Sequence, residues 1–178
     1  MTEYSETTVA LAGLVRVCEP PSASLALFVD KVGPAAAWRG VLDRRAPRPV
    51  LSATAARTQN LTREVLIERA HADLRVAAAA GARLIGRDDP DWPAHAVQSF
   101  EGALARGVRG AGPPVALYLR GRSLATLPEH AVTVVGSRAS SAYGQRVAGE
   151  LSHELAIRGL TIISGAAFGI DTAAHRSA

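Results

Sequence analysis

The sequence predicts an α/β protein in which a small helical domain precedes a parallel β-sheet. Through residues 7–42, apolar residues recur at spacings of three and four, which is the period of an amphipathic helix. Beyond residue 130, a short apolar run, a glycine-containing loop and a helical stretch follow one another twice. This order is typical of parallel strands, because a helix must return the chain to the starting edge of the sheet. We therefore expect a helical domain over residues 1–80 and an α/β domain over residues 81–178.

The expected helical domain is divided by turn-forming residues. Two or three short helices are predicted within residues 7–42, and Ser22, which follows two consecutive prolines, is the expected N-cap of the second. The basic, proline-containing residues 44–49 predict an extended linker. A longer helix is expected over residues 64–80, and Gly81 is well placed to end it.

The α/β part contains too few strands for a complete sheet. Strands are expected at residues 82–85, 115–119, 132–135 and 160–163, and helices at residues 143–158 and from about residue 171 onward. A Rossmann-like sheet typically has about five or six strands. The sequence therefore predicts an incomplete Rossmann-like parallel sheet and, with it, a fragment of a longer domain.

Two loops carry the residues that suit phosphate binding. In such sheets, ligands bind beyond the carboxyl ends of the strands, where helix N-termini present free N–H groups. In the first loop, Gly136 allows a close backbone approach, Ser137 adds a hydroxyl and Arg138 adds a guanidinium that can bind two phosphate oxygens. The second loop, residues 164–169, again combines a serine with glycines and has an aromatic ring near its tip. The candidate phosphate-binding residues are Gly136, Ser137, Arg138, Ser164, Gly165, Phe168 and Gly169.

Several other classes of site are disfavoured. The loop spacing does not follow the dinucleotide pattern G-x-G-x-x-G, so we expect no nicotinamide or flavin cofactor. Cys18 is the only cysteine and the histidines are scattered, so neither a disulfide nor a metal site is predicted. Charges interrupt every apolar run before the ~18 residues of a membrane span, and the acidic N-terminus is unlike a secretory signal. A cytoplasmic protein is expected.

The net charge of +4 is weak evidence for a partner. Lys31 is the only lysine, so nearly all basic residues are arginines, whose planar guanidinium suits phosphate. Genome base composition explains the same abundance of arginine. Charge alone therefore predicts no nucleic-acid partner.

The two loops and their flanks resemble the paired signatures of the DprA/Smf family of DNA-processing proteins. The matching residues are Val134-Val135-Gly136-Ser137-Arg138, Tyr143-Gly144, Ser164-Gly165, Ala167, Gly169-Ile170-Asp171 and Ala174-His175. Upstream, Asp89-Pro90-Asp91-Trp92-Pro93 and residues 113–121 resemble the lead-in to that family's Rossmann-like domain. The first 80 residues match only weakly, as a SAM or helix-hairpin-like domain.

The resemblance implies a cytoplasmic protein without a catalytic step. It implies sequence-independent binding of single-stranded DNA and its delivery to the RecA recombinase during DNA uptake and natural transformation, with a homodimer in the full-length family. By position, Ser137 and Arg138 would hold the DNA backbone, and Ser164, Gly165 and the Phe168-Gly169 tip would form the opposite wall.

Two aromatic residues near the loops have more than one interpretation. Phe168 occupies a place where many relatives carry a basic residue, and it either stacks on a base or packs in the core. Tyr143 either packs under the first loop or stacks on a base. Asp171 is expected to cap its helix and His175, one turn later, to pair with it.

Residues 18–22 contain an acid and no glycine, so the hairpin DNA contact of some relatives is not expected here.

Two alternative functions stay open at this stage. A Rossmann-like enzyme that cleaves nucleoside monophosphates at the glycosidic bond would use the same sheet edge for one phosphate. It would also need a glutamate and a run of glycines in a later loop, and the sequence ends before that loop. The other alternative is an inactive fragment with an uncovered sheet edge.

Overall fold

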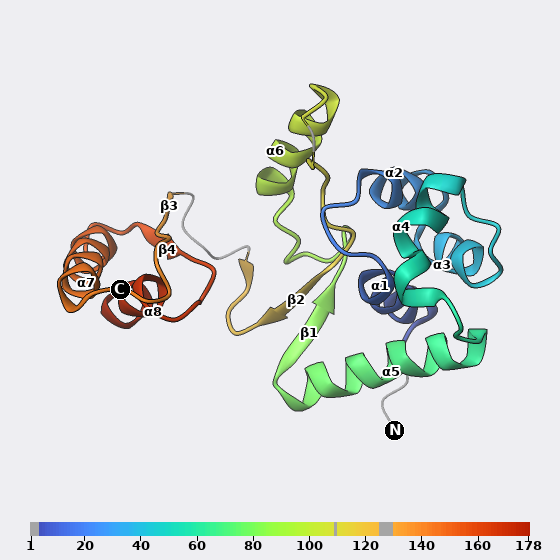
Figure 1. Cartoon of the computed structure of the whole chain (residues 1–178), viewed down its shortest axis with the longest axis horizontal. Coiled ribbons are helices and arrows are strands. Elements are labelled where there is room, and N and C mark those ends of the chain that lie inside the picture. Colours follow the sequence, from blue (N-terminus) through green and yellow to red (C-terminus); the bar gives the residue numbers. More distant parts are fainter. Residues whose placement is uncertain (1–3, 109, 125–129) are drawn as a thin grey trace. The chain divides into compact units, whose positions relative to one another are not determined.

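The computed structural model describes residues 4–108, 110–124 and 130–178, which fold as α/β (Figure 1). The chain divides into two compact units, an N-terminal unit of residues 1–125 and a C-terminal unit of residues 126–178. This division falls later than the domain boundary expected at residue 80, and that boundary stays a prediction. In the described parts of the chain, no helix is both long and apolar enough to cross a bilayer.

Helices make up most of the N-terminal unit. They are α1 (Glu6–Val17), α2 (Ala23–Val32), α3 (Pro34–Leu42), α4 (Arg48–Thr58) and α5 (Arg63–Ala79). The expected helices within residues 7–42 are confirmed as α1, α2 and α3. Ser22 caps α2, because its hydroxyl accepts a hydrogen bond from the Leu25 N–H at 3.4 Å.

The core of this unit lies where α1 meets the other helices. Leu14 and Val17 on α1, Val50 on α4 and Leu66 on α5 are almost fully buried together with the Trp38 ring of α3. Burial of side chains of this size stabilises the unit by about 1.5–3 kcal/mol each. The apolar spacing that predicted helices here therefore corresponds to the buried face of α1.

The linker predicted at residues 44–49 is wrong, because α4 begins within it at Arg48. Pro49 stands in the first turn of α4, where a helix tolerates proline because its first N–H groups have no helical partner. Val50 and Thr54 are the buried residues of α4, so the helix lacks the apolar stripe by which periodicity would have revealed it. The prolines begin a helix instead of forming an extended connection.

An antiparallel pair of strands completes the N-terminal unit. Gly81, at φ +70°, ends α5, as predicted, and β1 (Ala82–Ile85) follows directly (Figure 1). β1 pairs with β2 (Leu117–Arg120), and Arg83 lies opposite Leu119. α6 (Ala94–Ala105) lies between the two strands in sequence and was not predicted; Val97 is its one fully buried residue. These two strands therefore form their own sheet and do not join the parallel pair.

The C-terminal unit contains the predicted parallel pair. β3 (Ala131–Thr133) and β4 (Thr161–Ile163) run parallel, with Val132 opposite Ile162. α7 (Ala142–Ala156) follows the first strand and α8 (Ile170–Ser177) follows the second (Figure 1). The repeated strand, loop and helix order is thus confirmed, and so is the incomplete α/β fold class.

Small side chains let α7 and α8 approach closely. Ala148, Gly149 and Ser152 form the buried face of α7. A Cβ on Gly149 would lie 2.8 Å from the Ser177 hydroxyl of α8, so the absence of a side chain there leaves room for that hydroxyl. The His153 ring adds a 3.1 Å hydrogen bond to the Ser177 carbonyl oxygen.

Replacing Ser152 with alanine is expected to stabilise the C-terminal unit. The hydroxyl is fully buried and has no hydrogen-bond partner among the described residues. Removing it should raise the free energy of unfolding by about 1 kcal/mol, since an unpaired buried hydroxyl costs roughly that much. Native-state hydrogen exchange of the α7 amides measures the change. Ser99→Ala on the exposed side of α6 is the control for helix propensity, and faster exchange in Ser152→Ala would contradict the expectation.

Candidate nucleic-acid interface

The first candidate loop leads from β3 into α7. The Val134 N–H still bonds to the Ile163 carbonyl at 2.9 Å, so the parallel pairing reaches the base of the loop. Ser141 is the N-cap of α7 and accepts a hydrogen bond from the Gly144 N–H at 3.1 Å. The Ser140 hydroxyl instead accepts a bond from the side-chain amide of Gln145. Ser141, and not Ser140, therefore caps α7.

Short-range hydrogen bonds hold the second loop, residues 164–169, between β4 and α8. The Ser164 hydroxyl accepts a bond from the Ala166 N–H at 3.2 Å, and Ala166 has a positive φ of 52°. The Thr172 hydroxyl of α8 donates to the Ala167 carbonyl at 2.7 Å. Ser164 therefore has a structural role in shaping the loop as well as its candidate role in phosphate binding.

Asp171 holds the same loop from inside. Its side chain is only 4% exposed, and its carboxylate accepts a hydrogen bond from the Ala167 N–H at 3.4 Å. The N-cap position of α8 belongs to Gly169, and no side chain caps that helix. The prediction that Asp171 caps α8 is therefore wrong, and so is its pairing with His175, which is exposed and makes no hydrogen bond to it. The Asp171 carboxylate lies in the first turn of α8 but accepts its hydrogen bond from the N–H of Ala167 in the preceding loop.

The two loops are in direct contact through two glycines. Gly169, at φ +83°, approaches so closely that a Cβ would lie 2.2 Å from the Ser137 carbonyl oxygen and 2.7 Å from that of Arg138. The Ile170 N–H donates to the same Ser137 oxygen at 3.2 Å. In return, a Cβ on Gly136 would lie 2.6 Å from the Ile170 side chain. The structure thus brings the candidate residues of both loops to one surface beyond the ends of β3 and β4.

The backbone contact at Ile170 was missed by sequence reasoning. Ile170 fills the space that Gly136 leaves open, and its end also lies 3.5 Å from the position of a Cβ on Gly144. An apolar residue just after a loop glycine is a weak signal, because it also fits an ordinary first helical turn. The glycines indicated that another group approaches the loop backbone closely, but they did not identify Ile170 as that group.

Arg138 supplies the free positive charge of this surface. Its side chain is exposed, and the described residues give it no ion pair. Two other arginines of the unit are paired along α7, Arg146 with Glu150 at 3.8 Å and Arg158 with Glu154 at 2.6 Å. An unpaired guanidinium can bind a phosphate without first breaking an internal bond.

Two aromatic rings are exposed at the same loops. The Phe168 side chain at the tip of the second loop is 82% exposed, and that of Tyr143 in the first turn of α7 is 71% exposed. In the part of the chain that the structure describes, Phe168 is therefore not a core residue, and Tyr143 is not packed under the first loop. Those two interpretations are wrong. Exposed rings provide stacking surfaces for unpaired bases.

This protein is therefore an incomplete Rossmann-like α/β protein. Its parallel strand pair is followed by two helices, and the two contacting loops, residues 136–141 and 164–169, form one paired-loop surface. Residues 83–178 match the model of a protein family described as "DNA recombination-mediator protein A". The chain belongs to this family, known as DprA/Smf, and the resemblance noted from the loop motifs is confirmed.

Curated relatives agree with this assignment. The chain is 40% identical over 173 residues to the "Putative DNA processing protein DprA" of Mycobacterium tuberculosis H37Rv, a match covering 97% of the chain and 43% of that protein. It is 48% identical over 65 residues to "Protein Smf" of Escherichia coli K12, covering 36% of the chain and 17% of that protein. The "DNA processing protein DprA" of Bacillus subtilis 168 is 35% identical over 63 residues, covering 35% and 21%. The chain thus spans less than half the length of these relatives.

Proposed function

We propose that this chain binds single-stranded DNA without sequence preference, through the paired-loop surface formed by residues 136–141 and 164–169. The DNA-processing names of its relatives support the choice of ligand. The observation that carries the proposal is Arg138, an exposed guanidinium without an internal partner, on a loop that contacts Gly169 of the other loop. Phosphate binding by backbone and charge, without contacts to base edges, would explain the lack of sequence preference.

Each candidate residue has a stated role in this proposal. Arg138 binds phosphate oxygens, and Ser137 adds a hydroxyl beside it. Ser164 and Gly165 form the opposite side of the surface, where the backbone is open to a ligand. Phe168 stacks on a base, and Gly136 and Gly169 allow the close approach that brings the loops together.

We further propose that the bound strand is delivered to the RecA recombinase during DNA uptake, and that no catalytic step takes place. The description of the family as a recombination mediator supports this role. A cytoplasmic location and a homodimer of the longer family members belong to the same proposal. The dimer concerns proteins more than twice as long as this chain.

Salt dependence tests the proposed binding mode. Fluorescence anisotropy with a labelled oligo(dT) strand, a mixed-sequence strand of equal length and the matching duplex should give similar affinities for the two single strands and a weaker one for the duplex. The logarithm of the affinity should fall by about 0.7 per phosphate contact for each tenfold rise in salt. Affinity that is independent of salt, or that differs strongly between the two single strands, would contradict phosphate-based binding.

Replacing Phe168 with alanine is expected to weaken binding of every single strand by about fivefold. This corresponds to ~1 kcal/mol, the lower end of the range for one stacked base, because the ring stands on an exposed loop. Phe168→Tyr keeps a flat ring and should bind like the original chain. Equal affinities of the alanine and tyrosine variants would show that the ring does not stack.

A further inference from the structure

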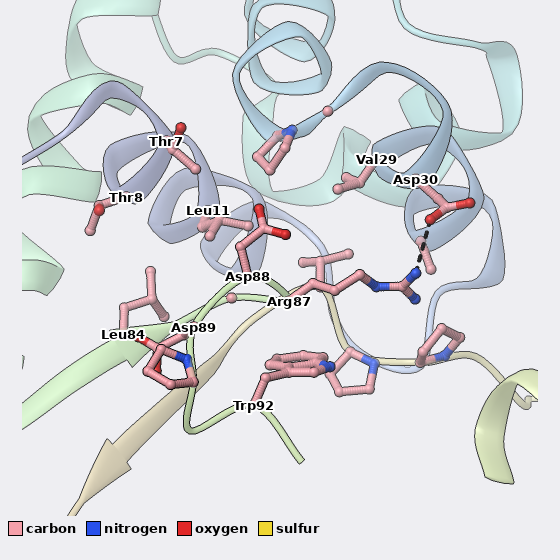
Figure 2. A pocket seen from close by; sticks show the side chains of 18 residues that line it. Thr7, Thr8, Leu11, Val29, Asp30, Leu84, Arg87, Asp88, Asp89 and Trp92 are labelled. Atoms are coloured by element: carbon pink, nitrogen blue, oxygen red, sulfur yellow. Dashed lines mark hydrogen bonds and ion pairs between the residues drawn. The ribbon is translucent and has the colours of Figure 1, made fainter. Parts of the chain in front are cut away.

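A pocket of about 520 Å³ lies in the N-terminal unit (Figure 2). None of its lining residues belongs to the paired-loop surface. Its walls come from α1, from α2 and its C-terminal turn, from the segment between β1 and α6, and from the residues before β2. All lining residues fall within residues 7–115, so the pocket belongs to one compact unit.

One part of the pocket is apolar and rigid. Leu11 of α1, Val29 of α2 and Leu84 of β1 contribute aliphatic side chains, and Trp92 contributes a ring that Figure 2 shows lying flat within the group. Four prolines also line it, at positions 34, 90, 113 and 114. Proline side chains lose no rotamer freedom on contact, and aromatic-lined grooves bind extended, proline-containing peptide segments.

The rim of the pocket is acidic, although the chain as a whole is basic. Asp30, Asp88 and Asp89 line it together with a single guanidinium, that of Arg87. Arg87 reaches across to Asp30 at 3.1 Å, as Figure 2 shows, and also bonds to Glu101. Its charge is therefore already balanced by two carboxylates.

Asp88 leaves a free negative charge at this rim. Asp89 is held by Arg83 at 2.8 Å, whereas the described residues give the exposed Asp88 no cationic partner. An unpaired carboxylate beside an apolar pocket repels phosphate and attracts a cation. The pocket is therefore unsuited to DNA and complementary to a side chain of the opposite charge.

We propose that this pocket binds an extended segment of a partner protein, in which an apolar side chain is followed or preceded by arginine or lysine. The apolar side chain contacts Trp92 and the prolines, and the basic side chain pairs with Asp88 at the rim. This inference goes beyond the proposed DNA binding and does not depend on it, because it uses a different ligand and residues of the other compact unit.

Nuclear magnetic resonance of the full chain, labelled with nitrogen-15, tests the proposal. The chain contains two tryptophans, and Trp38 is buried in the helical core at 5% exposure, so its indole signal serves as an internal reference. The variant Trp92→Phe assigns the other signal. The probe is the capped peptide acetyl-Pro-Leu-Arg-Pro-Leu-Arg-amide, and the matched control replaces both arginines with glutamate.

The arginine peptide should shift the Trp92 indole signal in a saturable way and leave that of Trp38 unchanged. The glutamate peptide should give no shift, and Asp88→Asn should weaken arginine-peptide binding by up to about fivefold, the range of one exposed ion pair. Equal shifts with both peptides, or no shift of Trp92 with the arginine peptide, would overturn the proposal. Asp43→Asn, which removes an acid of the same unit that does not line the pocket, is the charge control and should not change the affinity.

Discussion

Replacing Gly169 with alanine is expected to destabilise the C-terminal unit by about 2–5 kcal/mol and to abolish tight DNA binding. The backbone at φ +83° and ψ −123° lies in a region that residues other than glycine rarely adopt, which costs an alanine at least about 1–2 kcal/mol. The new methyl group would also lie 2.2 Å from the Ser137 carbonyl oxygen, an overlap that forces the loops apart at a further cost of about 1–3 kcal/mol. Hydrogen exchange of the α7 and α8 amides measures the loss of stability.

Gly159→Ala is the matched control for this variant. Gly159 shares the positive φ of Gly169, at +82°, but a Cβ there would have no atom within 4 Å. It should therefore show the cost of the backbone angle alone, about 1–2 kcal/mol, with unchanged DNA affinity. Equal losses of stability in the two variants would contradict the close contact between the loops.

Replacing Arg138 with alanine is expected to weaken single-stranded DNA binding about tenfold, by a similar factor for every sequence. Hydrogen bonds to charged groups contribute about 1.5–3 kcal/mol, and the exposed position of Arg138 favours the lower end. The salt slope should also decrease by about 0.7, because one phosphate contact is lost. Anisotropy titrations at several salt concentrations measure both changes.

Arg158→Ala removes the same charge at the other end of α7. Arg158 lies at the end of α7 opposite the loops and pairs with Glu154 at 2.6 Å, so its loss should leave affinity nearly unchanged. If the two arginine variants bind equally well, Arg138 has no specific role. A loss confined to certain DNA sequences would also contradict the proposed phosphate contact.

Local chemistry allowed much of the fold to be predicted from the sequence. Ser22 and Gly81 mark the start of α2 and the end of α5, because a hydroxyl cap and a left-handed glycine act within one helical turn. The strands at residues 131–133 and 161–163 were found because their apolar runs are short and bounded by loop glycines. Features that depend on a few adjacent residues can be predicted in this way.

Features that depend on tertiary packing were missed. α4 buries too few side chains to give a periodic signal, and packing places Val50 in the interior. α6 was also missed, although it buries Val97. The antiparallel pairing of β1 with β2 joins residues more than 30 positions apart, and nothing in either strand specifies its partner. Tertiary contacts decide such elements.

The candidate site was predicted as a set of residues but not as a geometry. Gly136 was chosen because it allows a close backbone approach, but the sequence did not show that the Ile170 side chain occupies the space beside it, or that Gly169 lies against the Ser137 carbonyl. Asp171 was predicted as a cap, but it lies two residues after the N-cap Gly169 and bonds backward to the Ala167 N–H. Loop conformation decides between these roles, and sequence spacing does not fix it.

The most direct test of the proposed function is to map the DNA footprint on the labelled chain. Amide signals should be followed during titration with a short oligo(dT) strand at low salt. The largest changes should fall in residues 136–141 and 164–169, with those of the acidic pocket around Asp88 unaffected. Changes confined to the N-terminal unit, with the two loops unperturbed, would contradict the paired-loop surface as the site of DNA binding.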